Sequence, residues 1–193
     1  MLQAQKLLKI PLKESKALVS KSIVSQGQKI CQRTLNSIAA DLKKVDNAIN
    51  ELIASDEELR RLFGIITSVT GVGTVTATQI IITTNEFKDI NDPKKFACYA
   101  GVAPFTRESG VFKGKARISH MANKKVKTLL HLSALVSINY NPDLKAYYER
   151  KVNEENKNKM LVINAVRNKL ILHIFACVNQ NRKYEKTYIR KVA

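Results

Sequence analysis

The sequence predicts a mainly α-helical protein: coiled-coil or antiparallel helices at the N-terminus, then a compact helical domain with a helix-hairpin-helix and one long basic loop. Three observations support this prediction. Apolar residues recur at helical spacings, cap and stop signals bound the helical stretches, and a glycine-containing basic segment interrupts the pattern between residues 102 and 119. With 45% hydrophobic and 25% charged residues, the composition is typical of a folded globular protein.

The first expected element is a long amphipathic helix whose apolar residues alternate spacings of three and four. These residues are Leu35, Ile38, Leu42, Val45, Ile49 and Leu52, and they form the a/d seam of a coiled coil or a long antiparallel helix pair. Because two to three heptads are marginal alone, we expect the seam to pack against a partner chain or against residues 10–28. Ser55 and Glu58 have capping-box spacing, so a second helix is expected to begin near Asp56.

Residues 66–85 present a choice between a strand and a helix. β-branched residues are dense in 74–84 and favour a strand. The sequence Gly71-Val72-Gly73, between two apolar segments, is instead typical of a helix-hairpin-helix, where glycines permit a tight turn that directs backbone N–H groups at a phosphate. We prefer the helix, which makes Gly71, Gly73 and Thr74 candidate nucleic-acid contacts. A plain turn is the alternative.

Four further helices follow from caps and periodicity. Asp92 as N-cap, Pro93 at the first position and Gly101 as the stop predict a short helix. Helical spacing runs over 122–138, and a new helix starts at 141–143. A last helix over about 159–179 buries one apolar face and leaves Arg167 and Lys169 on other faces; the buried residues are Ile163, Val166, Leu170, Ile174 and Val178.

The positive charge is unevenly distributed along the chain. The formal net charge is +17; residues 1–34 carry seven Lys/Arg against Glu14 alone, residues 35–100 seven against nine acidic residues, and residues 101–193 nineteen against six. A field of one sign attracts polyanions, so nucleic acid is the expected partner. A membrane partner is not expected, because the chain has no Trp and only six Phe to serve as interfacial anchors.

Targeting and metal-binding signals are not apparent in the sequence. No apolar run is long enough to cross a bilayer and residues 1–25 have no signal-peptide pattern, so the chain is expected to be intracellular and cytoplasmic. Cysteines and histidines are scattered, which argues against a disulfide framework or a zinc site; they are Cys31, Cys98, Cys177, His120, His131 and His173.

The long basic loop and the residues after it are the main candidate for phosphate binding. The basic side chains are Arg107, Lys113, Lys115, Arg117, Lys124, Lys125 and Lys127. If about six of them neutralise phosphates, log K for DNA should fall against log salt with a slope near −5. A solvated basic face is the alternative. Within the loop, Ser109 and Gly110 place a hydroxyl in a positive field, where it could meet a phosphate.

Several motifs in order give the chain a resemblance to a known family. They are TGVG at 70–73, AGVAPFTRESG at 100–110, RIS at 117–119, Asn123, and NPDLKAYYER at 141–150. Together they resemble the C-terminal domain of the insertion-sequence transposases of the one-ten family, a group that includes the pilin-gene inverting recombinase. The resemblance covers about residues 60–185, and the heptads before it resemble the coiled coil that joins this domain to the rest of such a transposase.

The resemblance implies a catalytic role for Ser109 in transposition and DNA recombination. In that family the serine of the Ser-Gly pair is taken as the nucleophile that attacks a DNA phosphodiester and leaves a phosphoserine link. Cations near the reacting phosphate stabilise its transition state, a role open to Arg107, Lys113, Lys115 and Arg117. The remaining site residues are Gly101, Pro104 and Gly110, which shape the loop, and Asn123, Lys124 and Lys127, which contact nucleic acid.

The resemblance also implies a second domain and further partners. Family members carry an N-terminal RNase-H-like domain in which four carboxylates hold Mg²⁺, whereas only about 34 residues precede the heptads here. The chain is therefore expected to be a truncated member, a fragment or a domain-only open reading frame, with no cofactor of its own and inactive alone. DNA is the expected partner, a structured guide RNA is a second, and a homo-oligomer is expected from the coiled coil.

The expected domains are a basic segment with coiled-coil helices (1–63), the transposase C-terminal domain (64–185) and a basic tail (186–193). Two positions depart from the family pattern. Residues 120–122 are His-Met-Ala where basic residues and a glycine are usual, and Lys127 stands where arginine is common. The alternative function is a non-catalytic helix-hairpin-helix module that binds DNA or RNA and self-associates through its coiled coil.

Overall fold

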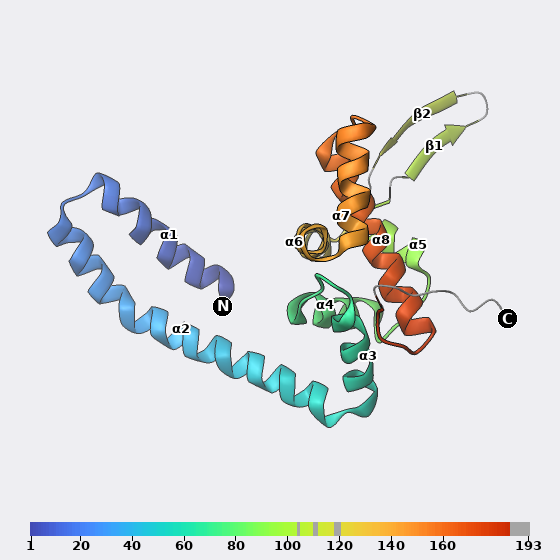
Figure 1. Cartoon of the computed structure of the whole chain (residues 1–193). Helices are drawn as coiled ribbons and strands as arrows, with labels where there is room; N and C mark the ends of the chain where they lie inside the picture. Colours follow the sequence, from blue (N-terminus) through green and yellow to red (C-terminus); the bar gives the residue numbers. More distant parts are fainter. Residues whose placement is uncertain (104, 110–111, 118–120, 186–193) are drawn as a thin grey trace. The chain divides into compact units, whose positions relative to one another are not determined.

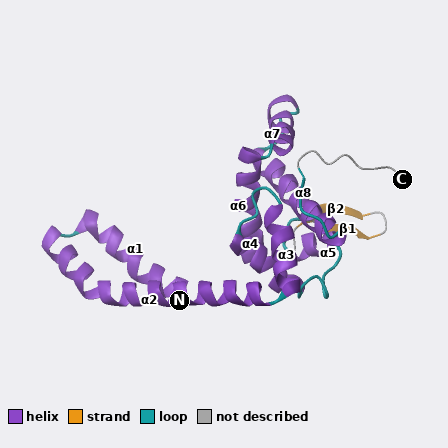
Figure 2. Cartoon of the chain, turned by 60° about the horizontal axis from the view of Figure 1, so that its bottom comes forward, coloured by secondary structure: helices purple, strands orange, loops and turns teal. Residues whose placement is uncertain are grey.

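The computed structural model describes residues 1–103, 105–109, 112–117 and 121–185, with the side chains of 15–17 and 104–120 excepted (Figure 1). Its contacts divide the chain into two units, Met1–Asp56 and Glu57–Ala193. Helices dominate both units, and the strands are confined to one short segment (Figure 2). The predicted mainly α-helical class is confirmed.

The N-terminal unit consists of two helices. α1 (Leu2–Leu18) packs against the longer α2 (Lys21–Ser55). The two helices approach closely where a Cβ added to Gly27 would lie 3.4 Å from Cδ2 of Leu12. Leu35 is the one seam residue that is buried, whereas Val45 and Leu52 are 48% and 64% exposed. The structure therefore contains a helix pair, and the coiled coil stays a prediction.

The break between α2 and the next helix lies where the sequence predicted it. Asp56 has an extended backbone, with φ −99° and ψ 124°, and α3 (Glu57–Ser68) begins immediately after it. Ser55 does not start this helix, because it is the last residue of α2 and its hydroxyl donates to the carbonyl of Leu52 at 3.0 Å.

The C-terminal unit contains the remaining elements. After α3 come α4 (Thr74–Thr84), α5 (Pro93–Tyr99), β1 (Phe105–Ser109), β2 (Phe112–Arg117), α6 (Lys124–Tyr140), α7 (Pro142–Glu149), the π-helical turn η1 (Arg150–Glu154) and α8 (Lys159–Asn179). α8 packs against α3, α5, α6 and α7. Phe175 of α8 contacts Phe87 and Phe96, with ring centroids 4.9 and 5.3 Å apart.

α8 is also long and apolar enough to cross a bilayer by length and composition, and it is the one such helix among the described residues. Its apolar side chains form the centre of the core, where Val166, Leu170 and Ile171 are fully buried. Arg167 was expected on another face of this helix and is instead only 5% exposed. The apolar character of α8 is thus explained by packing within the C-terminal unit.

Residues 74–84 form a helix, as predicted, despite their many β-branched side chains. Ala77, Ile80 and Ile81 lie on one buried face of α4. Thr84, also buried, donates its hydroxyl to the carbonyl of Ile80 at 2.8 Å, which satisfies a polar group inside the helix. Tertiary packing of this face therefore outweighs the strand propensity of the segment.

Side chains that accept from backbone N–H groups start four of the helices. Asp92 caps α5, and asparagines cap the next three helices: Asn123 for α6, Asn141 for α7 and Asn158 for α8. Each cap satisfies donors that would otherwise have no partner in the first turn. The predicted starts at Asp92 and at 141–143 are confirmed.

The segment expected to be one long loop contains a β-hairpin instead. β1 and β2 pair antiparallel and are drawn side by side in Figure 1. The prediction missed it because each strand is only five or six residues long and rich in basic residues, which hid the strand propensity of Phe105, Thr106 and Phe112.

Candidate nucleic-acid interface

The hairpin places Ser109 at the end of a strand. In the ladder Ser109 pairs with Phe112, Glu108 with Lys113, and Arg107 with Gly114. The register shifts between Phe105 and Arg107, as a β-bulge would produce. The backbone thus brings Arg107, Ser109, Lys113, Lys115 and Arg117 into one two-stranded element. Their side chains, and Pro104 and Gly110 altogether, lie outside the described residues, so their roles stay predictions.

Gly101 shapes the entry to this hairpin. Its φ of +63° lies in the left-handed region, which suits glycine at the end of α5. Its N–H donates to the carbonyl of Cys98 at 3.1 Å. One residue later, the carbonyl of Val102 accepts from the side-chain amide of Asn164 in α8 at 2.8 Å. The chain therefore enters β1 from a point that is fixed to the core helix.

Asn123 joins the start of α6 to the end of α5. Its Oδ1 accepts from the N–H groups of Lys125 and Val126, each at 3.1 Å. Its amide nitrogen Nδ2 donates to the hydroxyl of Tyr99 at 3.0 Å, and its backbone N–H donates to the Tyr99 carbonyl at 2.9 Å. These four bonds give Asn123 a structural role beside its predicted contact with nucleic acid.

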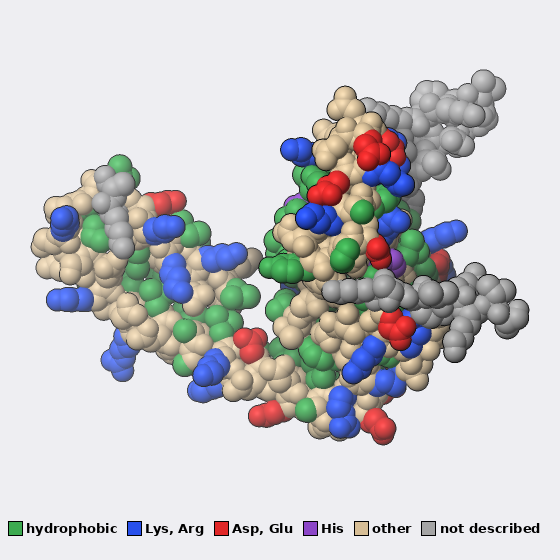
Figure 3. Space-filling model, in the orientation of Figure 1, with side chains coloured by type: hydrophobic (Ala, Val, Ile, Leu, Met, Phe, Trp, Pro, Cys, Tyr) green, Lys and Arg blue, Asp and Glu red, His purple; other side chains and the backbone are tan. Residues whose placement is uncertain are grey.

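The first turn of α6 holds an unusual concentration of positive charge. Lys124, Lys125 and Lys127 follow the cap, and this turn contains no acidic residue. No carboxylate in the described part of the chain forms an ion pair with any of the three. Lysines at a helix N-terminus oppose the helix dipole, so this arrangement disfavours the isolated protein and favours a bound anion. Lys and Arg side chains are spread over both units in Figure 3.

Gly71 has a packing role in the TGVG turn. Its φ is +92°, and a Cβ added there would overlap Oγ of Ser137 and lie 2.6 Å from the carbonyl oxygen of Ser133. At the same place, the hydroxyl of Ser137 donates a hydrogen bond to the carbonyl oxygen of Thr70 at 2.6 Å. Gly71 therefore lets the turn pack directly on α6.

Gly73 and Thr74 are the exposed part of this turn. Gly73 is the N-cap of α4, without a side-chain cap, and a Cβ added to it would meet nothing within 4 Å. The groove beside them is mainly apolar, since it is lined by Val75, Leu132 and Val136 among others. The backbone N–H groups at the start of α4 can therefore donate to an anion, although no described basic side chain lines the groove.

The predicted contacts fall into two separate places. Asn123, Lys124 and Lys127 lie at the start of α6, beside the end of α5 from which the chain enters the hairpin. The turn with Gly71 packs near Ser137, thirteen residues further along α6 than Lys124, which at 1.5 Å per residue is about 20 Å. The structure therefore does not bring the TGVG turn and the lysines together.

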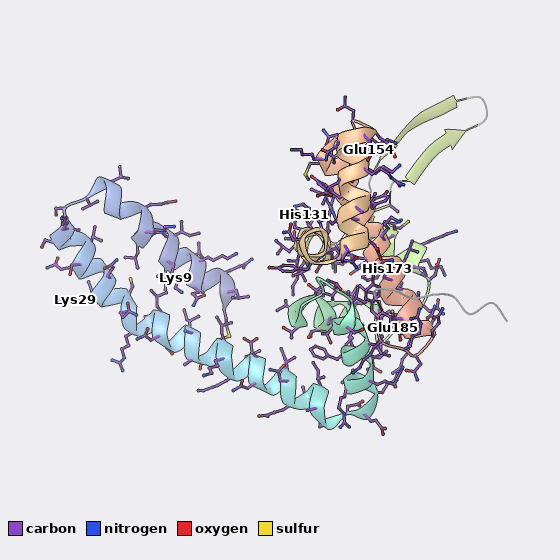
Figure 4. All side chains as sticks on the ribbon, viewed as in Figure 1. Lys9, Lys29, His131, Glu154, His173 and Glu185 are labelled. Carbon is purple, nitrogen blue, oxygen red and sulfur yellow. The ribbon has the colours of Figure 1, made fainter. Side chains whose placement is uncertain are left out.

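Sequence reasoning missed a buried basic residue. Arg167 of α8 is 5% exposed, and its Nε has no hydrogen-bond partner. His131 of α6, labelled in Figure 4, also has an unpartnered buried Nδ1, and its pKa is lowered by burial and by the charge of Arg167. The signal that could have revealed Arg167 is its position between Val166 and Leu170 in an otherwise apolar face.

Among the described residues, no three His, Cys, Asp or Glu side chains lie together in a way that could hold a metal ion. The acidic side chains of α2 and α3 are mostly exposed, as are those around η1. These side chains do not form a four-carboxylate Mg²⁺ site of the kind that the family resemblance implies for another domain.

Comparison with known proteins agrees with the motifs. Residues 64–149 match the family described as Transposase IS116/IS110/IS902. A pilin gene-inverting protein of Moraxella bovis is 26% identical over 147 residues, which cover 75% of this chain and 45% of that protein. An IS110 protein of 43.6 kDa from Streptomyces coelicolor is 26% identical over 172 residues, covering 88% of this chain and 42% of that protein.

An IS900 protein of 42 kDa from Mycobacterium paratuberculosis is 27% identical over 148 residues, 75% of this chain and 37% of that protein. The chain thus spans less than half the length of these curated relatives. The matched region begins in α3, within the C-terminal unit, and includes the TGVG turn, the hairpin and the start of α6.

Proposed function

We propose, from the premise that residues 64–149 belong to the Transposase IS116/IS110/IS902 family, that the C-terminal unit binds DNA and supplies a serine nucleophile for strand exchange. The observation that carries the DNA-binding part is the first turn of α6. Three lysines without a described carboxylate partner stand there at the positive end of a helix dipole. The phosphates of a DNA backbone would neutralise the charge of these lysines and the positive end of the helix dipole.

The nucleophile in this proposal is Ser109. Its Oγ would form a bond to a phosphorus of the DNA backbone, the bond from that phosphorus to a deoxyribose oxygen would break, and the serine proton would leave with the released oxygen. The product is a phosphoserine ester and a free DNA end, so the phosphodiester energy is kept for rejoining. Arg107, Lys113, Lys115 and Arg117 would stabilise the negative charge that develops on the phosphate.

Serine needs a base or a metal to become nucleophilic. The activating group and Mg²⁺ are proposed to come from a carboxylate-bearing domain such as the longer relatives could contain. Oligomerisation through α2, and contact with a structured guide RNA, belong to the same proposal. A second copy of the chain would bring a second DNA segment into the complex, and a guide RNA would bring an RNA segment.

The test for Ser109 is a strand-exchange assay with this chain fused to the N-terminal part of a relative. Ser109→Ala should abolish exchange and the covalent protein–DNA adduct, and should leave the affinity for duplex DNA within about twofold, since the phosphate contacts are kept. Ser22→Ala, at the exposed start of α2, is the matched control. Exchange by the Ser109→Ala fusion would remove this residue from the mechanism.

A second candidate function is a non-catalytic DNA- or RNA-binding module. It is favoured by the uncapped start of α4, where N–H groups after Gly73 are open to a phosphate. Gly73→Glu introduces a negative charge at a position with free space and an ordinary φ of −86°, so the variant should fold. Loss of DNA binding in this variant, with Ser109→Ala fully active in every assay, would favour the module over the enzyme.

A further inference from the structure

A cavity in the C-terminal unit carries aromatic and basic side chains that have no role in the function proposed above. It has a volume of about 320 Å³ and lies between α7, α8 and the segment that follows α8. Tyr147, Lys169, His173 and Tyr184 form part of its wall, and His173 is labelled in Figure 4. Sites for small organic ligands measure about 300 to 1,000 Å³, so the cavity could take one small ligand.

One aromatic wall of this cavity is already fixed in position. The backbone N–H of Tyr184 donates to the hydroxyl of Ser68 at 2.8 Å, and its own hydroxyl accepts from Nδ2 of Asn141 at 2.9 Å. Its ring stacks on His173, with centroids 5.3 Å apart and planes 28° from parallel. A ligand would therefore meet a preformed surface and would not have to order it.

Positive charge gathers around the second aromatic ring. The ammonium of Lys169 lies 4.5 Å from the centroid of the Tyr147 ring. Arg150 and Lys151 lie 5.9 and 6.0 Å from the same centroid. Arg150 and Lys151 also form ion pairs with Glu155, at 4.0 and 2.6 Å, whereas no described carboxylate forms an ion pair with Lys169. Lys169 is therefore the cation of the three that the cavity offers to a phosphate.

Hydrogen-bonding groups complete the lining. The carboxylates of Asp143 and Glu185 and the guanidinium of Arg182 are part of the wall. Nδ1 of His173 is buried and has no hydrogen-bond partner. Carboxylates can accept from the amino groups of nucleobases, and lysine or arginine can bind a phosphate. The cavity therefore offers partners to both the edge and the backbone of a nucleotide.

We propose that this cavity binds one unpaired nucleotide of a single-stranded nucleic acid. The base would lie against Tyr147 and Tyr184, and its phosphate would contact Lys169. Stacking on aromatic side chains together with cations along the backbone is how proteins hold single strands without reading a sequence. The bases of an intact duplex are stacked inside it and could not enter. The inference does not rest on Ser109 or on α6, so it stands or falls separately from the proposed function.

The test measures fluorescence anisotropy of the full chain with labelled oligothymidylate, oligouridylate and a duplex of the same length. Lys169→Met and Tyr147→Leu should each weaken binding of the single strands about tenfold and change duplex binding by less than about twofold. Lys159→Met, at the exposed start of α8, removes the same charge as Lys169→Met. Tyr147→Phe keeps the ring, and both controls should bind as the unchanged chain does.

The two single strands distinguish the natural ligand. Equal affinities would mean that base and phosphate are bound without the sugar. A preference for oligouridylate over both oligothymidylate and oligodeoxyuridylate, which lacks the 5-methyl group as well as the 2′-hydroxyl, would show a contact with the 2′-hydroxyl. Unchanged binding of both strands by Lys169→Met and Tyr147→Leu would overturn the proposal, and so would an equal loss of duplex binding. Lys124→Gln should weaken duplex binding alone, which keeps the two sites distinguishable.

A second measurement uses the unchanged chain, so it does not depend on whether a variant folds. Photo-cross-linking to an oligonucleotide that carries 5-iodouracil should attach the base to the peptides that contain Tyr147 or Tyr184. Cross-links confined to other peptides would overturn the assignment of this cavity.

Discussion

Gly71 and Ser137 are in direct contact, and the contact leaves no room for a side chain on the glycine. A Cβ at residue 71 would overlap the Ser137 hydroxyl and lie 2.8 Å from the Ser137 backbone nitrogen. The same hydroxyl bonds to the carbonyl of Thr70. Of the two glycines in the TGVG motif, Gly71 therefore serves the packing of the turn against α6.

Gly71→Ala should destabilise the C-terminal unit. The positive φ and the overlap with α6 together should lower the free energy of unfolding by about 2 to 4 kcal/mol. Gly73→Ala is the control, because its Cβ would occupy free space, and it should cost less than about 1 kcal/mol. Thermal or urea unfolding followed by circular dichroism gives both values. Equal costs for the two variants would show that Gly71 is not packed as described.

Asn123→Asp should separate the structural role of this residue from nucleic-acid binding. Aspartate caps a helix as well as asparagine does, and its carboxylate can accept from the Tyr99 hydroxyl, so stability should change by less than about 1 kcal/mol. The added negative charge at the start of α6 should weaken DNA binding. Asn123→Ala should instead lose about 1 kcal/mol of stability. DNA titrations and unfolding curves on both variants check this.

Lys124→Gln and Lys127→Gln should each reduce the steepness of the salt dependence of DNA binding. If each lysine neutralises one phosphate, the slope of log K against log salt should become less negative by about 0.9 per substitution. Removing a positive charge from a helix N-terminus should also stabilise the unbound protein slightly, by about 0.3 to 1 kcal/mol. An unchanged slope in both variants would place the phosphate contacts elsewhere.

Mild acid should destabilise the protein through the half-buried His173. Burial and the nearby Lys169 lower the pKa of His173, and Asp143 opposes them in part. The neutral imidazole is thus favoured in the folded state. Stability is complete above the unfolded pKa near 6.5 and is lost as the pH falls through the lower folded pKa.

Urea unfolding at several pH values between about 7.5 and 5 should show this loss, and His173→Gln should reduce it. The carboxylate of Glu155, whose pKa is lowered by its bond to Lys151, is protonated only at lower pH, below its ordinary value of 4.5. A pH profile that does not change in His173→Gln would contradict the assignment to this histidine.

Arg167→Met should stabilise the folded chain. The guanidinium is buried, no described carboxylate forms an ion pair with it, and burial lowers its pKa. Replacing such a charge with an apolar side chain of similar length should raise the free energy of unfolding by about 1 kcal/mol or more. It should also raise the pKa of His131 towards 6.5, which NMR titration would report. A less stable variant would indicate a favourable partner for Arg167.

Local signals in the sequence predicted much of this fold. The cap at Asp92, the restart at Asn141 and the glycines around Val72 located three helix starts, because caps and turns depend on neighbouring residues. Long-range contacts have no such signal. The bond from Asn141 to the hydroxyl of Tyr184 joins residues 43 apart, and it builds a wall of the cavity that no motif in the sequence indicated.

The candidate site shows the same division. The basic residues that surround Ser109 could be found from composition and family resemblance. The hairpin that holds them could not, because two strands of five and six residues are too short to give a clear alternating pattern in a mainly helical sequence. Burial of Arg167 depends on how α6 and α8 pack, and a periodic pattern places a residue on a face without saying how deep that face lies.

The asparagine caps have an electrostatic consequence for the whole C-terminal unit. Aspartate would cap α6 and α8 equally well and would also neutralise the positive end of each helix dipole. Asn123 and Asn158 cap without charge, and neither helix has an acidic residue in its first turn. Two helix N-termini therefore keep their full positive potential and add to the attraction of polyanions without any additional basic side chain.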